Sequence, residues 1–227
     1  MKDKLLSVYS RIETAATDSG RLPGAVKLVA VSKTVPIEKL QTAIESGVTI
    51  LGENYIQESR DKFNALYTHP VSWHFIGHLQ SNKSKYAVKM FDLIHSVDSL
   101  KLARELNKQA RKIDKIQNVL VQVNISEESS KSGVLLGDTG QLVTEMSGMT
   151  HIAVKGLMTM PPYFNAPEKV RPYFKKLRQL RDQIMTMNIP GVSLEELSMG
   201  MTGDFEVAIQ EGATLVRIGT AIFGERV

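Results

Sequence analysis

The chain has 227 residues, of which 42% are hydrophobic and 23% charged, and it contains no cysteine. The apolar content excludes intrinsic disorder, and the missing cysteine excludes disulfide scaffolds, thiolate zinc sites, iron–sulfur clusters and cysteine nucleophiles. Lysine and arginine number 28 against 24 aspartate and glutamate, a net charge of +4. This excess is compatible with an anionic ligand but is too small to indicate a nucleic-acid partner.

The first residues do not resemble a targeting signal, because Lys2, Asp3 and Lys4 are charged and Ser7 interrupts the next apolar residues. Apolar runs elsewhere are far shorter than the roughly 18 residues that a membrane helix needs. We therefore expect a cytoplasmic protein with no membrane partner.

Short runs rich in β-branched residues alternate along the chain with longer segments of helical spacing. The predicted strands number eight and cover residues 26–31, 48–51, 72–76, 93–97, 118–123, 152–157, 194–198 and 214–218. The predicted helices between them cover residues 36–46, 55–67, 81–91, 100–112, 141–147, 167–187 and 204–210. A further helix over residues 5–17 is predicted to precede the first strand.

This alternation predicts an α/β fold with a parallel sheet, and eight units permit closure into a single (β/α)₈ TIM-type barrel. A doubly wound open sheet is the alternative. The barrel is favoured because eight strands in so short a chain fit one closed ring. No linker-like segment divides the sequence, so we expect one domain over residues 1–227, with an extra N-terminal helix within residues 1–20.

In a barrel, functional residues collect where strands end and the following loops begin. Lys33 follows the apolar segment 27–31 and is predicted to lie at this mouth. A lysine in apolar surroundings loses its proton readily and can attack a carbonyl to form a Schiff base. The alternative is a side chain that only reaches solvent, as most lysines do.

The last two strand ends match the phosphate site that is usual in this architecture. Gly200 and Gly219 allow a close approach of the backbone to an anion, and hydroxyl groups are offered by Ser198, Thr202 and Thr220. Ordinary turn chemistry would explain the same residues, but two such clusters at the expected pair of strands favour a phosphate site.

Arg217, in the last predicted strand, can donate hydrogen bonds but cannot accept a proton. A structural ion pair with Glu196 or another strand-end carboxylate is the alternative. Weaker candidates are Asn54, which can cap a helix, and His78, because the histidines lack metal-ligand spacing with carboxylates. The lysines at 83 and 85 indicate a solvated helix start.

Several sequence blocks, in order along nearly the whole chain, resemble the YggS/PROSC family of pyridoxal phosphate homeostasis proteins. These blocks are AVSKT (30–34), GENYIQE (52–58), WHFIGHLQSNK (73–83), VNIS (123–126), KSG (131–133), GLM (156–158), LSMGMTGD (197–204) and VRIGTAIFG (216–224). One departure is Thr202, where the family more often has serine; the hydroxyl is retained.

The resemblance implies a barrel like the N-terminal domain of alanine racemase, with pyridoxal 5′-phosphate (PLP) bound as a Schiff base on Lys33. It also implies that Arg217 faces the pyridine nitrogen of PLP. The phosphate is implied to be held by Ser198, Gly200, Gly219 and Thr220, and the ring pocket to be lined by Asn54, Met158 and Met199.

An arginine at the ring nitrogen would leave it unprotonated and weaken PLP as an electron sink. No part of the sequence is left over for the second domain and partner-subunit base that racemases use. We therefore expect a non-enzymatic protein that buffers PLP or delivers it to apo PLP-dependent enzymes. We also expect a monomer. A racemase or decarboxylase and a PLP-free Schiff-base aldolase are the alternatives. Lys131 can serve as a second attachment point during transfer, or it is a plain surface lysine.

Overall fold

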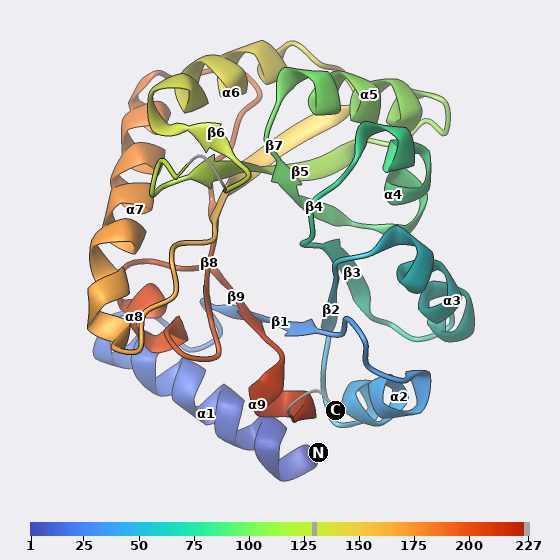
Figure 1. Cartoon of the computed structure of the whole chain (residues 1–227), viewed down its shortest axis with the longest axis vertical. Coiled ribbons are helices and arrows are strands. Elements are labelled where there is room, and N and C mark those ends of the chain that lie inside the picture. Colours follow the sequence, from blue (N-terminus) through green and yellow to red (C-terminus); the bar gives the residue numbers. More distant parts are fainter. Residues whose placement is uncertain (129–130, 225–227) are drawn as a thin grey trace.

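The computed structural model describes residues 1–128 and 131–224 and shows a barrel of parallel strands ringed by helices (Figure 1). The strands are β1 Lys27–Val31, β2 Ile50–Glu53, β3 Ser72–Phe75, β4 Leu93–Val97, β5 Gln117–Asn124, β6 Val134–Leu135, β7 Ile152–Thr159, β8 Glu196–Met201 and β9 Leu215–Ile218. Pairing of β1 with both β2 and β9, and of β4 with β5, closes the ring. The predicted barrel is confirmed, and the open-sheet alternative is wrong.

The short strand β6 pairs with the end of β5 and was not predicted from the sequence. Each of the other strands overlaps one predicted run, and all the pairings are parallel. Parallel strands bring all their carboxyl ends to one end of the barrel, which is the mouth. The loops that were predicted to carry chemistry therefore meet there.

The helices alternate with the strands, as the apolar spacing predicts. They are α1 Lys2–Asp18, α2 Ile37–Glu45, α3 Ile56–Leu66, α4 Ser84–Met90, α5 Leu100–Arg111, α6 Thr139–Ser147, α7 Arg171–Thr186, α8 Phe205–Gln210 and α9 Thr220–Phe223, with short 3₁₀ turns at Ser81–Lys83, Leu136–Asp138 and Pro167–Val170. The leading helix α1 packs against α8 and α9, the two helices that follow the predicted phosphate loops (Figure 1). None of the helices within the described ranges is long and apolar enough to cross a membrane.

The core has two parts, because successive side chains of a strand face opposite sides of the sheet. The larger part lies between the barrel and the helices and includes Leu51, Ile94 and Leu197. The smaller part fills the barrel interior and comprises Val29, Ile50, Ile76, Leu93, Leu120, Met158 and Leu215. Side chains two residues from these inner positions, such as His74, His95 and Arg217, also face the interior and add a polar layer to it.

Candidate functional site

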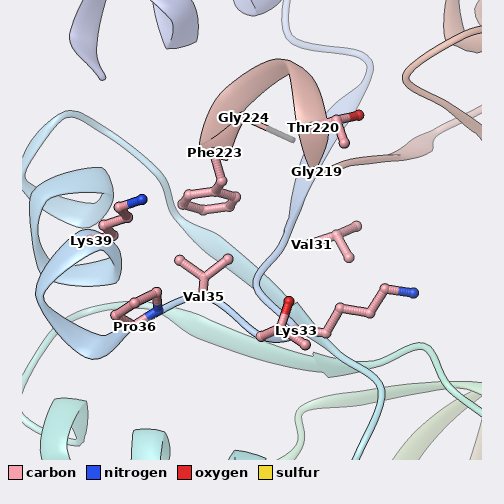
Figure 2. Close-up of a pocket in the computed structure, with 10 residues that line it drawn as sticks. Val31, Lys33, Val35, Pro36, Lys39, Gly219, Thr220, Phe223 and Gly224 are labelled. Carbon is pink, nitrogen blue, oxygen red and sulfur yellow. The ribbon is translucent and has the colours of Figure 1, made fainter. Parts of the chain in front are cut away.

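Lys33 lies at the barrel mouth, in the loop between β1 and α2, where its position in the sequence predicts it. It is half-buried and lines a cavity of about 260 Å³ together with Gly219, Thr220 and Phe223 (Figure 2). Lys39 of α2 lines the same cavity, but the Lys33 side chain extends away from Lys39 and from the Phe223 ring (Figure 2). Lys33 and the residues at the end of β9 therefore line the same cavity.

The loops after β8 and β9 meet through their hydroxyl groups. Thr220 Oγ1 donates a hydrogen bond to Thr202 Oγ1 at 3.2 Å. Gly200 has φ +90°, and a Cβ there would stand 2.6 Å from the Cβ of Ala208. Any residue with a Cβ would therefore clash at Gly200. The glycine lets the backbone at the end of β8 stay close to the helix that follows it. These two loops form a cradle of hydroxyl and glycine backbone that suits a phosphate group.

Arg217 is buried in the barrel interior below the mouth and is held by two neighbouring strands. Its Nη1 donates to Ser198 Oγ at 2.5 Å and its Nη2 donates to the Thr159 carbonyl at 2.8 Å. Burial lowers the pKa of the guanidinium to about 10, so the group is still protonated at neutral pH. The suggested ion pair with Glu196 is wrong, because Glu196 instead accepts from Lys27 and Thr214.

A column of hydrogen-bonded polar side chains runs from Arg217 into the barrel. Ser198 Oγ lies 2.9 Å from His95 Nδ1, and His95 Nε2 lies 3.0 Å from His74 Nδ1. Because Arg217 can only donate, Ser198 accepts from it and gives its own proton to His95 Nδ1. Each neutral imidazole then carries its proton on Nε2. Burial lowers the pKa of His74 to about 4 and holds the pKa of His95 well below its usual range, which keeps both rings neutral.

The column opens at the other end of the barrel. His74 lines a cavity of about 380 Å³ there, together with Lys27, Asp92 and Glu196. No sequence pattern predicts this arrangement, since His74 and His95 are 21 residues apart and belong to neighbouring strands. His78, by contrast, is exposed at the mouth, with its Nδ1 4.0 Å from Asp98 Oδ2.

The remaining predicted ligands are Asn54, Met158, Ser198 and Met199. Asn54 is half-buried after β2, and its Oδ1 is a buried oxygen with no hydrogen-bond partner. Met158 is fully buried in the barrel interior. Ser198 lies beneath the mouth, with its hydroxyl engaged by Arg217 and His95. Met199 belongs to the core between barrel and helices, on the face of β8 opposite Ser198, so the structure does not bring it to the mouth.

A buried ionic cluster beside Lys33 was missed at the sequence level. It joins Lys62 of α3 to Glu53, at the end of β2, and to Glu58. The only local signal is the four-residue spacing of Glu58 and Lys62, which is common on solvated helix faces. In the part of the chain that the structure describes, no group of histidine and carboxylate side chains could hold a metal ion.

The fold and the residues at its mouth place the protein in the class of barrels of the alanine racemase type. The family model "Alanine racemase, N-terminal domain" matches residues 9–227. More specifically, the chain belongs to the pyridoxal phosphate homeostasis protein family. It is 46% identical over 224 residues to the pyridoxal phosphate homeostasis protein of Aquifex aeolicus, covering 99% of this chain and 97% of that protein. With the Escherichia coli K12 protein of the same name it shares 42% identity, over 98% and 95% of the two chains.

Solved structures agree with this assignment. PipY of Synechococcus elongatus, solved without PLP, has 33% identity, a TM-score of 0.88 and coverage of 99% of this chain and 100% of that one. PipY with PLP bound has a TM-score of 0.82, with 33% identity and coverage of 94% and 100%. An alanine racemase of Clostridium difficile has a TM-score of 0.76 at 14% identity, and this chain covers 57% of it. That last likeness concerns the fold alone.

Proposed function

We propose that this chain binds PLP at the barrel mouth, with Lys33 as its covalent attachment point, and takes part in PLP homeostasis. The observation that carries the proposal is the single cavity shared by Lys33, Gly219 and Thr220. The proposal is supported because an aldehyde that bears a phosphate ester requires an amine together with glycine backbone and hydroxyl groups that can hold phosphate. The PLP-bound form of PipY supports the same ligand.

The residues of the mouth fit PLP group by group. The phosphate is assigned to Gly200, Thr202, Gly219 and Thr220, whose loops meet at the Thr202–Thr220 hydrogen bond. Ser198, which the family resemblance also assigns to the phosphate, is better placed to support Arg217. Asn54, with its unpartnered buried Oδ1, and Met158 are assigned to the surroundings of the ring.

Bound PLP would supply an aldehyde, with which the Lys33 amine can condense with loss of one water. Arg217 is assigned to the ring nitrogen of PLP. Its guanidinium is anchored by Ser198 and Thr159 and has no proton-accepting atom, so it can only donate a hydrogen bond there. Such a partner leaves the ring nitrogen unprotonated and limits how well the ring stabilises a carbanion.

We further propose that the chain holds PLP for buffering or delivery to apo PLP-dependent enzymes, without catalytic turnover. The names of the relatives support this role, since they describe homeostasis and not a reaction. Lys131, half-buried beyond β5, is retained as a second attachment point during transfer; its carbonyl lies 3.4 Å from Asn124 Nδ2.

The test compares Lys33→Ala with Lys39→Ala, which removes a lysine of the same cavity. We expect the visible absorption band of covalently held PLP in the unaltered chain and in Lys39→Ala, and its loss in Lys33→Ala. Borohydride reduction followed by peptide mass spectrometry should place the label on residue 33. A Lys33→Ala variant that keeps the band would overturn the assignment of Lys33. Sustained, Lys33-dependent racemisation or decarboxylation of amino acids by the loaded protein would overturn the non-enzymatic role.

A further inference from the structure

A lysine side chain is almost fully buried behind the loop that carries Lys33. Lys62, 5% exposed, reaches from α3 toward the end of β1. Its Nζ lies 2.6 Å from Glu58 Oε1 and 2.9 Å from Glu53 Oε1, and it donates to the Ser32 carbonyl at 2.5 Å. The ammonium group thus makes three short hydrogen bonds, one of them to the residue directly before Lys33.

The cluster also holds the loop on the other side of Lys33. Glu58 Oε1 accepts a hydrogen bond from the Thr34 backbone N–H at 2.5 Å. Glu53 Oε1 accepts from Ser32 Oγ at 2.6 Å. Ser32 and Thr34, the two neighbours of Lys33 in the chain, are therefore both bonded to groups of the cluster.

The backbone at Thr34 needs such support. Its φ is +63°, in the left-handed region that non-glycine residues rarely adopt. A conformation of this kind persists only where surrounding contacts fix it, and here the Glu58 carboxylate bonds the amide of the same residue. The turn at Thr34 directs the chain from Lys33 toward α2, so the bond to Glu58 holds the backbone that follows Lys33.

A contribution to stability does not by itself explain why the charges of this cluster are buried. Burying charged groups costs desolvation free energy, and well-packed apolar side chains often stabilise a fold equally well. Glu53 is fully buried, and its Oε2 has no hydrogen-bond partner, so part of this cost is not offset. Such an arrangement beside the nucleophile is consistent with a functional demand on the loop.

We propose that Glu53, Glu58 and Lys62 are positioning residues for Lys33, which hold the backbone on both of its sides so that its amine meets the PLP aldehyde at the barrel mouth. The inference deepens the proposed function and rests on Lys33 being the attachment point. It assigns no contact between the cluster and PLP.

The test uses two substitutions at Glu58, whose side chain is 27% exposed and so tolerates change better than the buried members of the cluster. Glu58→Gln keeps an oxygen that can accept from the Thr34 amide, whereas Glu58→Ala removes it. Glu105→Ala is the matched control, because Glu105 has a 30% exposed side chain and accepts from Gln109 within helix α5, away from the loop.

Two measurements are made on the full chain. In the PLP-free protein, hydrogen exchange at the Thr34 amide should be about tenfold or more faster in Glu58→Ala than in Glu58→Gln or Glu105→Ala. In stopped-flow mixing with PLP, the visible band should form about tenfold more slowly in Glu58→Ala, since small misplacements of a reacting group carry rate costs of this order or larger. The label after reduction should still be on Lys33.

Unchanged exchange and an unchanged rate of band formation in folded Glu58→Ala would overturn the inference. A second pair of variants guards against loss of the fold. Lys62→Met leaves the carboxylates of Glu53 and Glu58 without their cation. The double variant with Glu53→Gln and Lys62→Met removes one positive and one negative charge together. A folded double variant that attaches PLP at the normal rate would also contradict the positioning role of the cluster. These outcomes differ from failure of the proposed function, which is a Lys33→Ala variant that retains the band.

Discussion

Gly200 occupies a backbone conformation at the phosphate loop that other residues adopt only with strain. Its φ is +90°, and a Cβ would stand 3.0 Å from the Phe205 Cα as well as 2.6 Å from the Ala208 Cβ. Gly200→Ala should therefore lower the free energy of unfolding by about 1–3 kcal/mol and displace the loop that faces the phosphate. Urea unfolding and titration with PLP should show both a lower midpoint and a weaker affinity.

Gly203, two residues beyond the end of β8, provides the control. A Cβ at Gly203 would meet no atom within 4 Å, and its φ lies outside the left-handed region. Gly203→Ala should leave stability and PLP affinity close to those of the unaltered chain. Equal losses of affinity in both variants would show that the loop responds to any added side chain, which contradicts the specific role assigned to Gly200.

The strand-end position of a residue was enough to predict Lys33, Gly219 and Thr220 at the mouth, because every parallel strand delivers its carboxyl end there. Two residues of β8 show the limit of this reasoning, because Ser198 lies beneath the mouth and Met199 faces the helices. They are adjacent, so one must face the barrel interior and the other the helices. Both faces are buried and Met199 is apolar, so composition does not tell which residue faces which way.

At the scale of elements, α1 supports the phosphate loops from behind, because it packs against α8 and α9. Ile12 lies on the buried face of α1 and is 3% exposed. Ile12→Ala should lower the free energy of unfolding by about 2–5 kcal/mol, the range for truncating a buried aliphatic side chain. It should also weaken PLP binding under conditions where the protein is still folded, since the helices after both phosphate loops lose part of their support.

Leu106, fully buried on α5, is the control for Ile12. Helix α5 packs against α4 and α6 and not directly behind the phosphate loops. Leu106→Ala should lower the urea midpoint by a similar amount and leave the PLP dissociation constant nearly unchanged. If both variants lost the same PLP affinity, general destabilisation would explain the effect and α1 would have no local role.

The order of elements was predictable because apolar periodicity is a local property, and the eight barrel strands each overlap a predicted run. Strand β6, with two residues, is too short to carry a period and depends on pairing with the end of β5. The Lys62 cluster depends likewise on β1, β2 and α3 meeting in space. Such features arise from packing between segments that are distant in sequence, and no single segment encodes them.

At the scale of the whole molecule, the Arg217–Ser198–His95–His74 column links the mouth to the opposite end of the barrel and makes stability depend on pH. Burial lowers the pKa of His74 from 6.5 to about 4, so the unfolded chain binds this proton at a higher pH than the folded chain does. Neutral His74 thus contributes stability that is fully present above pH 6.5 and is lost as the pH falls through 6.5 toward 4. A shift of this size corresponds to roughly 3 kcal/mol, and His95 acts in the same direction.

Urea unfolding between pH 7.5 and pH 4.5 should therefore show a falling midpoint in the unaltered chain. The double variant His74→Gln with His95→Gln should show a flatter dependence, because glutamine cannot take up the proton that unfolding makes available. If the double variant kept the full slope, the loss of stability would belong to surface carboxylates, and the column would serve only to hold Arg217 in place.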